Sequence, residues 1–171
     1  MAYPTNIDVR ITSLAGAQPA TETSTTQKHP IGTKVTALDH GAGARGEIEL
    51  VYGKGVASTV AGDVVILDNK GPDSTRVVTT SRGTVGVAMS ANVASQYGWY
   101  AVRGVVPVSA AGTVAANAQL FATATAGELD DAITAGAMVN GAVSQAADSA
   151  DFLEVMLSYP SMTGNGDASG N

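Results

Sequence analysis

The chain is built from short runs rich in Val, Ile and Thr, and turn residues interrupt these runs at intervals of roughly ten residues. β-branched side chains are stiff at χ1 and suit a pleated sheet better than a helix. Turn pairs such as Gly62-Asp63 and Asn140-Gly141 stand near the ends of the runs, and Asn-Gly favours a tight hairpin. We therefore expect an all-β fold, a small sandwich or barrel of short antiparallel strands.

The pattern predicts nine strands, and in 47–52 and 152–157 apolar residues alternate with others as in half-buried strands. Pro107 lies inside one of the runs, so we expect that strand to lie at an edge or to end there. Two short segments, 91–97 and 127–133, are candidate helices, and no strict internal repeat is evident. The predicted strands are 33–38, 47–52, 64–67, 76–80, 84–89, 99–108, 120–123, 137–143 and 152–157.

The two ends of the chain differ in composition from its middle. Residues 12–26 are mostly Thr, Ala and Ser with a single charge, and residues 161–171 are mainly Gly, Ser, Asn and Asp. Such segments bury little, so we expect an extended N-terminal arm over 1–29, a β domain over 30–160 and a flexible C-terminal tail over 161–171. The abundance of Ala and Val predicts a thin core, which favours an oligomer or an assembly.

Charge is distributed unevenly along the chain. Residues 1–103 carry all nine Lys and Arg with eight acids, whereas residues 104–171 carry seven acids and no Lys or Arg. An acidic region repels nucleic acid, and no basic patch with interleaved aromatic residues is evident, so we expect no nucleic-acid partner. No apolar run is long enough for a membrane span, and we see no secretory signal, so we also expect no membrane partner.

The motifs that could bind a cofactor or a metal ion are weak. Residues 41–46 match G-x-G-x-x-G, but the residues that follow read as a strand where a dinucleotide-binding fold needs a helix. His29 and His40 are the two histidines, and a metal site needs three or four converging ligands. The chain has no cysteine, which excludes disulfides and thiolate ligands.

Acidic pairs occur at Asp130-Asp131 and at Asp148 and Asp151, where they suit solvated loops or, at most, weak Ca²⁺ binding. A glycosidase would need two carboxylates flanking a sugar. The sequence contains no Gly-x-Ser-x-Gly elbow, no cysteine nucleophile and no P-loop. We therefore expect no enzyme activity, no cofactor and no metal site.

From residue 30 to residue 157 the chain resembles the small decoration, or cement, proteins of bacteriophage capsids. The resemblance rests on turn-and-strand motifs in a particular order, each of which is weak alone. The main ones are Gly62-Asp63-Val64-Val65, Thr84-Val85-Gly86-Val87-Ala88 and Tyr100-Ala101-Val102-Arg103-Gly104.

The resemblance implies a structural virion protein that binds the outer surface of an assembled capsid and stabilises it by bridging capsid subunits. The implied partner is the major capsid protein, and the implied location is the outer capsid surface, with the host cytoplasm during assembly. It also implies a homo-oligomer, with a trimer favoured and a dimer possible, and it brings no catalytic residues. The alternative is a β-sandwich adhesion or head-fibre binding module exposed on the virion or cell surface.

Two groups of residues are candidates for contacts with partners. The aromatic pair Trp99-Tyr100 is expected to anchor the core or an interface, and we take it as a candidate interface anchor. In the N-terminal arm, Thr-rich extended chain can pair with a strand edge on a neighbour. The expected capsid-contact residues of the arm are Tyr3, Ile7, Val9, Ile11 and Leu14.

Overall fold

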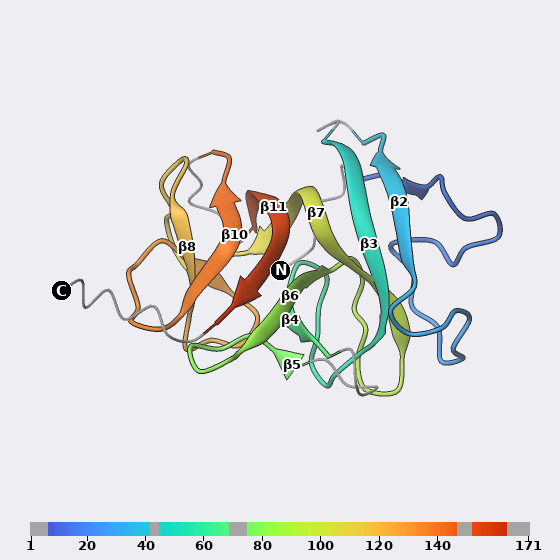
Figure 1. The fold of residues 1–171 in the computed structure, drawn as a ribbon, viewed down its shortest axis with the longest axis horizontal. Coiled ribbons are helices and arrows are strands. Elements are labelled where there is room, and N and C mark those ends of the chain that lie inside the picture. Colours follow the sequence, from blue (N-terminus) through green and yellow to red (C-terminus); the bar gives the residue numbers. More distant parts are fainter. Residues whose placement is uncertain (1–6, 42–44, 69–74, 147–151, 164–171) are drawn as a thin grey trace.

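The structure is a computed structural model that describes residues 7–41, 45–68, 75–146 and 152–163. These residues form eleven strands in one antiparallel sheet and contain no helix, which confirms the all-β prediction (Figure 1). The sheet is not closed into a barrel, so of the two expected architectures it is consistent with the sandwich. The strands are β1 (Val9–Ile11), β2 (Lys34–Asp39), β3 (Gly46–Lys54), β4 (Val64–Leu67), β5 (Thr75–Arg76), β6 (Gly83–Ala88), β7 (Tyr97–Ser109), β8 (Gln119–Ala122), β9 (Leu129–Asp130), β10 (Met138–Ser144) and β11 (Phe152–Met162).

The long strand β7 joins the two sides of the molecule, with β2 and β3 on one side and β8, β10 and β11 on the other (Figure 1). Its first half pairs with β3 as far as Arg103, and its second half pairs with β11. Gly104 lies where one partner gives way to the other, with a φ of 101°. A Cβ atom at this position would lie 2.4 Å from the carbonyl oxygen of Glu47, so the strand can cross here only with a glycine.

Pro107 lies within β7, and the strand continues past it to Ser109. Its strand partner is Glu154 of β11, whereas the pairing with β3 ends at Arg103. The proline therefore occupies a stretch that is paired on one side, as its missing N–H requires. Neither expectation describes the whole strand: β7 lies inside the sheet between β3 and β6 and continues past the proline, and among the described residues β11 is the partner strand of the stretch that contains Pro107.

Two groups of five strands have the same topology and share β7. We call β3 to β7 module A and β7 to β11 module B. In each module the first strand pairs with the fifth, the second with the third and fourth, and the fourth with the fifth, always antiparallel. No repeat was evident in the sequence, because the two modules have the same backbone pairing and chain direction but mostly different side chains at corresponding positions.

The hydrogen bonds of the two modules agree residue by residue, at a nearly constant spacing along the chain. The N–H of Gly62 donates to Ala88 O at 2.8 Å in module A, and the N–H of Asn117 donates to Ser144 O at 3.1 Å in module B. Gly62 and Asn117 both have positive φ, of 91° and 57°. The strand register gives further counterparts. The pair Val87–Ala101 in module A corresponds to the pair Val143–Met156 in module B. The pair Ala88–Tyr100 corresponds in the same way to the pair Ser144–Val155.

Neither candidate helix forms. Residues 91–97 make turns up to the start of β7, and Asn92 within them is fully buried, with its Oδ1 accepting a hydrogen bond from Ser90 Oγ at 3.1 Å. The segment 127–133 contains β9, which pairs with β8. Both segments are Ala-rich or polar without a helical apolar face, so tertiary hydrogen bonds decide their conformation. The predicted strand 76–80 is likewise shorter than expected, because β5 ends at Arg76.

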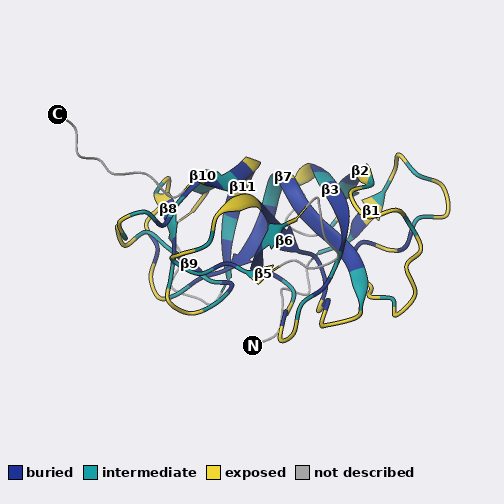
Figure 2. Ribbon diagram, turned by 60° about the horizontal axis from the view of Figure 1, so that its bottom comes forward, coloured by how far each residue is buried: buried dark blue, intermediate teal, exposed yellow. Residues whose placement is uncertain are grey.

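The N-terminal segment, residues 7–29, lies along the side of the sheet and belongs in part to the core. Val9 and Ala20 are members of the main hydrophobic cluster, and Gln18 is almost fully buried. The sequence led us to expect an arm that buries little, and the difference arises because β1 pairs with β2 and Gln18 is hydrogen-bonded to the sheet, as described below. Figure 2 shows that the buried residues concentrate on the central strands, while the loops of this segment are mostly exposed. At the other end, the expected tail begins within β11, and residues 164–171 lie outside the described residues.

Candidate functional site

Within the part of the chain that the structure describes, β1 is the outermost strand at one end of the sheet, and its one partner strand is β2. His40 N–H donates to Asp8 O at 2.8 Å, and Thr12 N–H donates to Thr36 O at 2.9 Å. Hydrogen-bonded residues alternate along an antiparallel pair, so the main-chain groups of Val9 and Ile11 point away from β2. The strand therefore offers an unpaired edge to an incoming chain.

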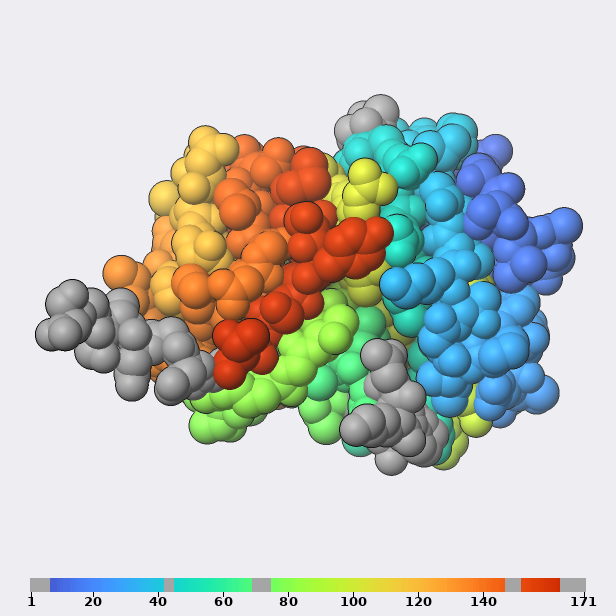
Figure 3. All heavy atoms as spheres, in the orientation of Figure 1, coloured from blue at the N-terminus to red at the C-terminus, as the bar shows by residue number. Residues whose placement is uncertain are grey.

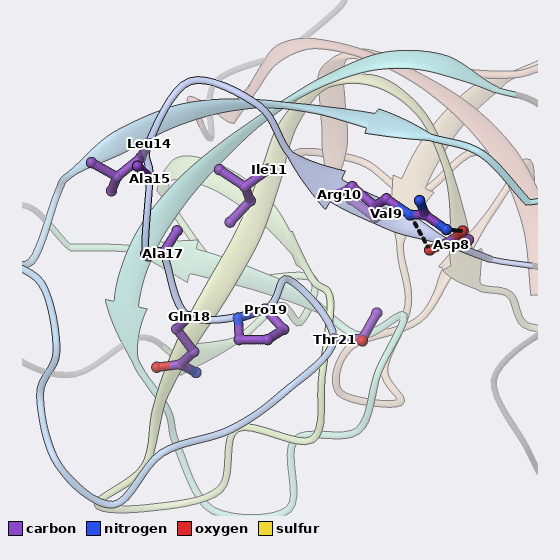
Figure 4. A pocket seen from close by; sticks show the side chains of 11 residues that line it. Asp8, Val9, Arg10, Ile11, Leu14, Ala15, Ala17, Gln18, Pro19 and Thr21 are labelled. Carbon is purple, nitrogen blue, oxygen red and sulfur yellow. Dashed lines mark hydrogen bonds and ion pairs between the residues drawn. The ribbon is translucent and has the colours of Figure 1, made fainter.

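A groove of about 450 Å³ lies between β1 and the loop that follows it (Figure 4). Its rim carries an ion pair in which Arg10 Nη2 lies 2.6 Å from Asp8 Oδ2, and both side chains are largely exposed. This hydrogen bond and the charge of Arg10 lower the pKa of Asp8. The residues that line the groove all come from this one segment: Asp8, Val9, Arg10, Ile11, Leu14, Ala15, Gly16, Ala17, Gln18, Pro19 and Thr21.

The structure divides the expected capsid-contact residues. Val9 is 8% exposed and packs in the core, so its side chain is not available to a partner. Ile7, Ile11 and Leu14 are half-buried against the same core and keep part of their surface open. Tyr3 lies outside the described residues.

Gln18 fastens the segment to the sheet. Its Nε2 donates to the carbonyl oxygens of Glu22 at 2.7 Å and Tyr97 at 3.0 Å, and its Oε1 accepts from Tyr52 Oη at 3.1 Å. The carbonyl oxygen of Gln18 accepts from Trp99 Nε1 at 2.8 Å. Sequence reasoning missed this residue, since its partners lie far away along the chain and a lone Gln in a polar run carries no signal.

The expected interface anchors, Trp99 and Tyr100, are both 0% exposed. Trp99 lies in an aromatic cluster, with its ring centroid 4.9 Å from that of Tyr52 and 5.5 Å from that of His29. Tyr100 packs on the other side of the sheet with Val65. Both residues anchor the core, and their assignment to a surface interface is wrong because neither reaches the surface.

Arg45 forms a second polar link, between the start of β3 and β11. Its guanidinium is 3.0 Å from Asp39 Oδ2 and 2.8 Å from Glu154 Oε1, and the Arg45 and Asp39 side chains are buried. Burial would raise the pKa of Asp39, but hydrogen bonds from the N–H groups of Gly41 and Asp8 and from Arg45 outweigh it, so the pKa is lowered. The folded state therefore favours the ionised form of the Asp39 carboxylate.

Asp63 is a second buried acid, at the junction of the two modules. Its Oδ2 accepts from Val60 N–H at 2.9 Å and lies 2.8 Å from Arg76 Nε, and its Oδ1 is 3.4 Å from Ser109 Oγ. Burial raises the pKa of Asp63 in spite of these contacts. Its role in this arrangement is structural, because its contacts hold the turn at Val60 and connect that turn to Arg76 of β5 and Ser109 of β7.

The outward-facing residues of β2, β3, β7 and β11 form a mixed surface, which we call the outer face. We define it by Lys34, Glu47, Glu49, Arg103, Met156 and Tyr159. Tyr159 Oη donates to Glu49 Oε2 at 2.6 Å, and Lys34 Nζ lies 5.6 Å from the centre of the tyrosine ring. Arg103 pairs with Glu47 at 3.4 Å. Figure 3 shows the atoms of β11 (red) meeting those of β2 and β3 (cyan) on this side of the molecule.

The motifs considered for chemistry do not come together. Asp130 and Asp131 accept hydrogen bonds from the N–H groups of Asp131 and Ala115, which fixes turns. The described residues contain no group of three His, Asp or Glu side chains that could hold a metal ion. His29 accepts a hydrogen bond from Gln18 N–H at 3.2 Å and serves the N-terminal segment. Asp148 and Asp151 lie outside the described residues.

Within the described ranges, no helix could cross a membrane. Comparisons of the chain with family models, with curated proteins and with solved structures found no match.

Proposed function

We propose that the protein is a structural component of a bacteriophage particle that binds the outer surface of the assembled capsid and stabilises it by bridging neighbouring subunits. The observation that carries the proposal is the open edge of β1 beside its groove. An exposed strand edge with a neighbouring groove can pair with an extended segment of another protein, and the groove then holds alternate side chains. The resemblance to cement proteins supplies the identity of the partner, the major capsid protein.

Stabilisation of the shell follows from mass action. A protein that binds the assembled capsid and not its dissociated subunits shifts the equilibrium by RT ln(1 + [L]/Kd) at each site. Many weakly bound copies then raise the stability of the whole particle, provided that each copy spans more than one subunit. The protein needs a rigid surface for this, which the sheet and its polar links provide.

Bare and decorated capsids should differ in thermal melting and in retention of DNA at low salt. We expect decorated particles to melt at a higher temperature and to keep their DNA longer. If the two kinds of particle melt and retain DNA alike, the cement function is wrong, and the alternative of an adhesion or head-fibre module becomes the better account.

The role of the β1 edge can be tested with a proline. Ile11→Pro removes an N–H that points away from β2, so it leaves the ladder with β2 intact and blocks pairing at the open edge. We expect capsid binding to fall in co-sedimentation while the far-ultraviolet circular dichroism of the free protein is retained.

Ala135→Pro is the matched control, because Ala135 lies outside the groove. Ala135 is the second residue of a turn closed by Ala137 N–H and Thr134 O at 3.0 Å, and Gly136 after it has a φ of 71°. Proline suits the second position of such a turn, so this variant should bind as the parent does. Equal binding by the Ile11 variant would mean that capsid contact lies elsewhere on the molecule.

A further inference from the structure

Tyr159 on the outer face has a backbone conformation that an aromatic residue rarely adopts. Its φ is 47°, and its counterpart in module A is Gly104, which also has a positive φ. Positive φ costs free energy for a residue with a Cβ atom, and a bulky side chain there is uncommon. The fold itself could use glycine or asparagine at this place, so the tyrosine ring has to be explained by what it contacts.

Tyr159 and Met156 are exposed and lie on the same strand, 52% and 41% accessible. The ring of Tyr159 is held in place by Glu49 and Lys34, so binding would cost it little conformational entropy. Tyr, Met and Arg are enriched in the buried centres of protein interfaces. Arg103, on the neighbouring strand, lines a shallow groove together with Met156.

The charges of the outer face indicate what covers it. Lys34 and Arg103 are balanced by Glu47 and Glu49, each next to a residue of opposite sign. Such a face selects neither an acidic nor a basic partner, but it matches a copy of itself rotated by a two-fold axis. In that arrangement each Arg103 faces the Glu47 of the other copy.

We propose that the outer face is the contact surface for a second copy of this chain, with Met156 and Tyr159 at its centre and Arg103 and Glu47 exchanging partners across a two-fold axis. Two sheets pack face to face in this way in β-sandwiches. The contact makes a dimer, the state that the sequence left open beside a trimer. It is independent of capsid binding, and its test needs only the purified chain.

The first test is the mass of the full-length protein by sedimentation velocity over a range of concentrations. We expect a dimer. A monomer at every concentration, or a trimer, would overturn the proposal, because a two-fold contact closes with two copies.

Point variants locate the contact. Met156→Glu places a charge at the centre of the outer face, and Tyr159→Asn removes the ring while keeping a residue that tolerates positive φ. Each should raise the dimer dissociation constant by about tenfold or more, with the melting temperature of the monomer maintained. Ile133→Glu is the control, since Ile133 is 87% exposed and lies outside the outer face; the proposal is wrong if this variant weakens the dimer as much as the other two.

Charge-reversal variants show whether Arg103 and Glu47 interact between two copies of the chain or only within one copy. Glu47→Arg places arginines at both position 47 and position 103 of each outer face, and Arg103→Glu places glutamates at both of these positions. Each variant alone should be monomeric, and an equimolar mixture should form heterodimers because every arginine then meets a glutamate. A mixture that stays monomeric would show that these charges act only within the chain and would refute the proposed arrangement.

Discussion

At the scale of single residues, the side chain of Gln18 joins three parts of the chain that the sequence keeps far apart. It bonds Glu22 nearby, Tyr52 on β3 and Tyr97 at the start of β7. Polar contacts of this kind leave no pattern in the sequence, since neither spacing nor composition marks the partners. The same is true of Arg45, whose two acids lie on different strands.

Gln18→Ala should lower the free energy of unfolding by about 2–3 kcal/mol, because it removes the hydrogen bonds of the Gln18 side chain to Glu22 O and Tyr97 O and leaves the buried Tyr52 hydroxyl without its acceptor. Urea denaturation measures the change. Gln27→Ala is the control, since the Gln27 side chain makes one exposed hydrogen bond, to His29 O; it should change stability by less than about 0.5 kcal/mol. Equal effects of the two substitutions would contradict the fastening role of Gln18.

Asp39 should make stability depend on pH in the acid range. Its pKa is lowered in the folded state, so its stabilising contribution is present above the usual carboxyl pKa of about 3.9 and is lost as the pH falls through the folded value. Asp39→Asn should therefore cost about 2–3 kcal/mol at pH 7, and the difference from the parent should shrink below about pH 4. Urea titrations at pH 7 and at successively lower pH measure both quantities, and a difference that does not change with pH would exclude this role.

At the scale of elements, the runs of β-branched residues were sufficient to place the main strands. The predicted strands 47–52 and 152–157 lie within β3 and β11, which are longer, at Gly46–Lys54 and Phe152–Met162. The strands that sequence analysis missed are β1 and β9, whose three and two residues are too short to show alternation. Helices were predicted wrongly in 91–97 and 127–133, because hydrogen bonds to neighbouring parts of the sheet decide the conformation of both segments.

The crossing of β7 from one partner to the other depends on Gly104. Gly104→Ala would place a Cβ atom 2.4 Å from Glu47 O at a φ of 101°, and we expect a loss of about 3 kcal/mol or more. Gly112→Ala is the control, because Gly112 also has a positive φ, of 83°, but nothing lies within 4 Å of the added atom. That variant should lose about 1 kcal/mol, and thermal melting of both would show whether close approach or backbone conformation dominates.

At the scale of the whole molecule, the two modules share a strand, so neither can unfold while the other keeps all its pairs. β7 supplies the fifth strand of module A and the first of module B. We expect one cooperative transition in calorimetry, with equal calorimetric and van't Hoff enthalpies. Two resolved transitions would mean that the modules are independent.

The N-terminal segment also belongs to this cooperative unit. A variant that lacks residues 1–28 loses the carbonyl partner of Trp99 Nε1 and the amide partner of Tyr52. We expect a lower melting temperature and greater binding of a hydrophobic dye than for the full chain, because the aromatic cluster becomes exposed. An unchanged melting temperature would mean that this segment is a separate arm that contributes nothing to the stability of the β domain.

The sharing of β7 also shows where each long strand changes its partner. After Gly104, β7 leaves β3 and continues beside β11, whereas after Tyr159, β11 leaves β7 and pairs with β6, Ser161 with Thr84 and Met162 with Gly83. The backbone conformation at these two positive-φ positions therefore decides which strands link the modules, so the linkage between modules and the pairing inside each module are separate features of the sequence.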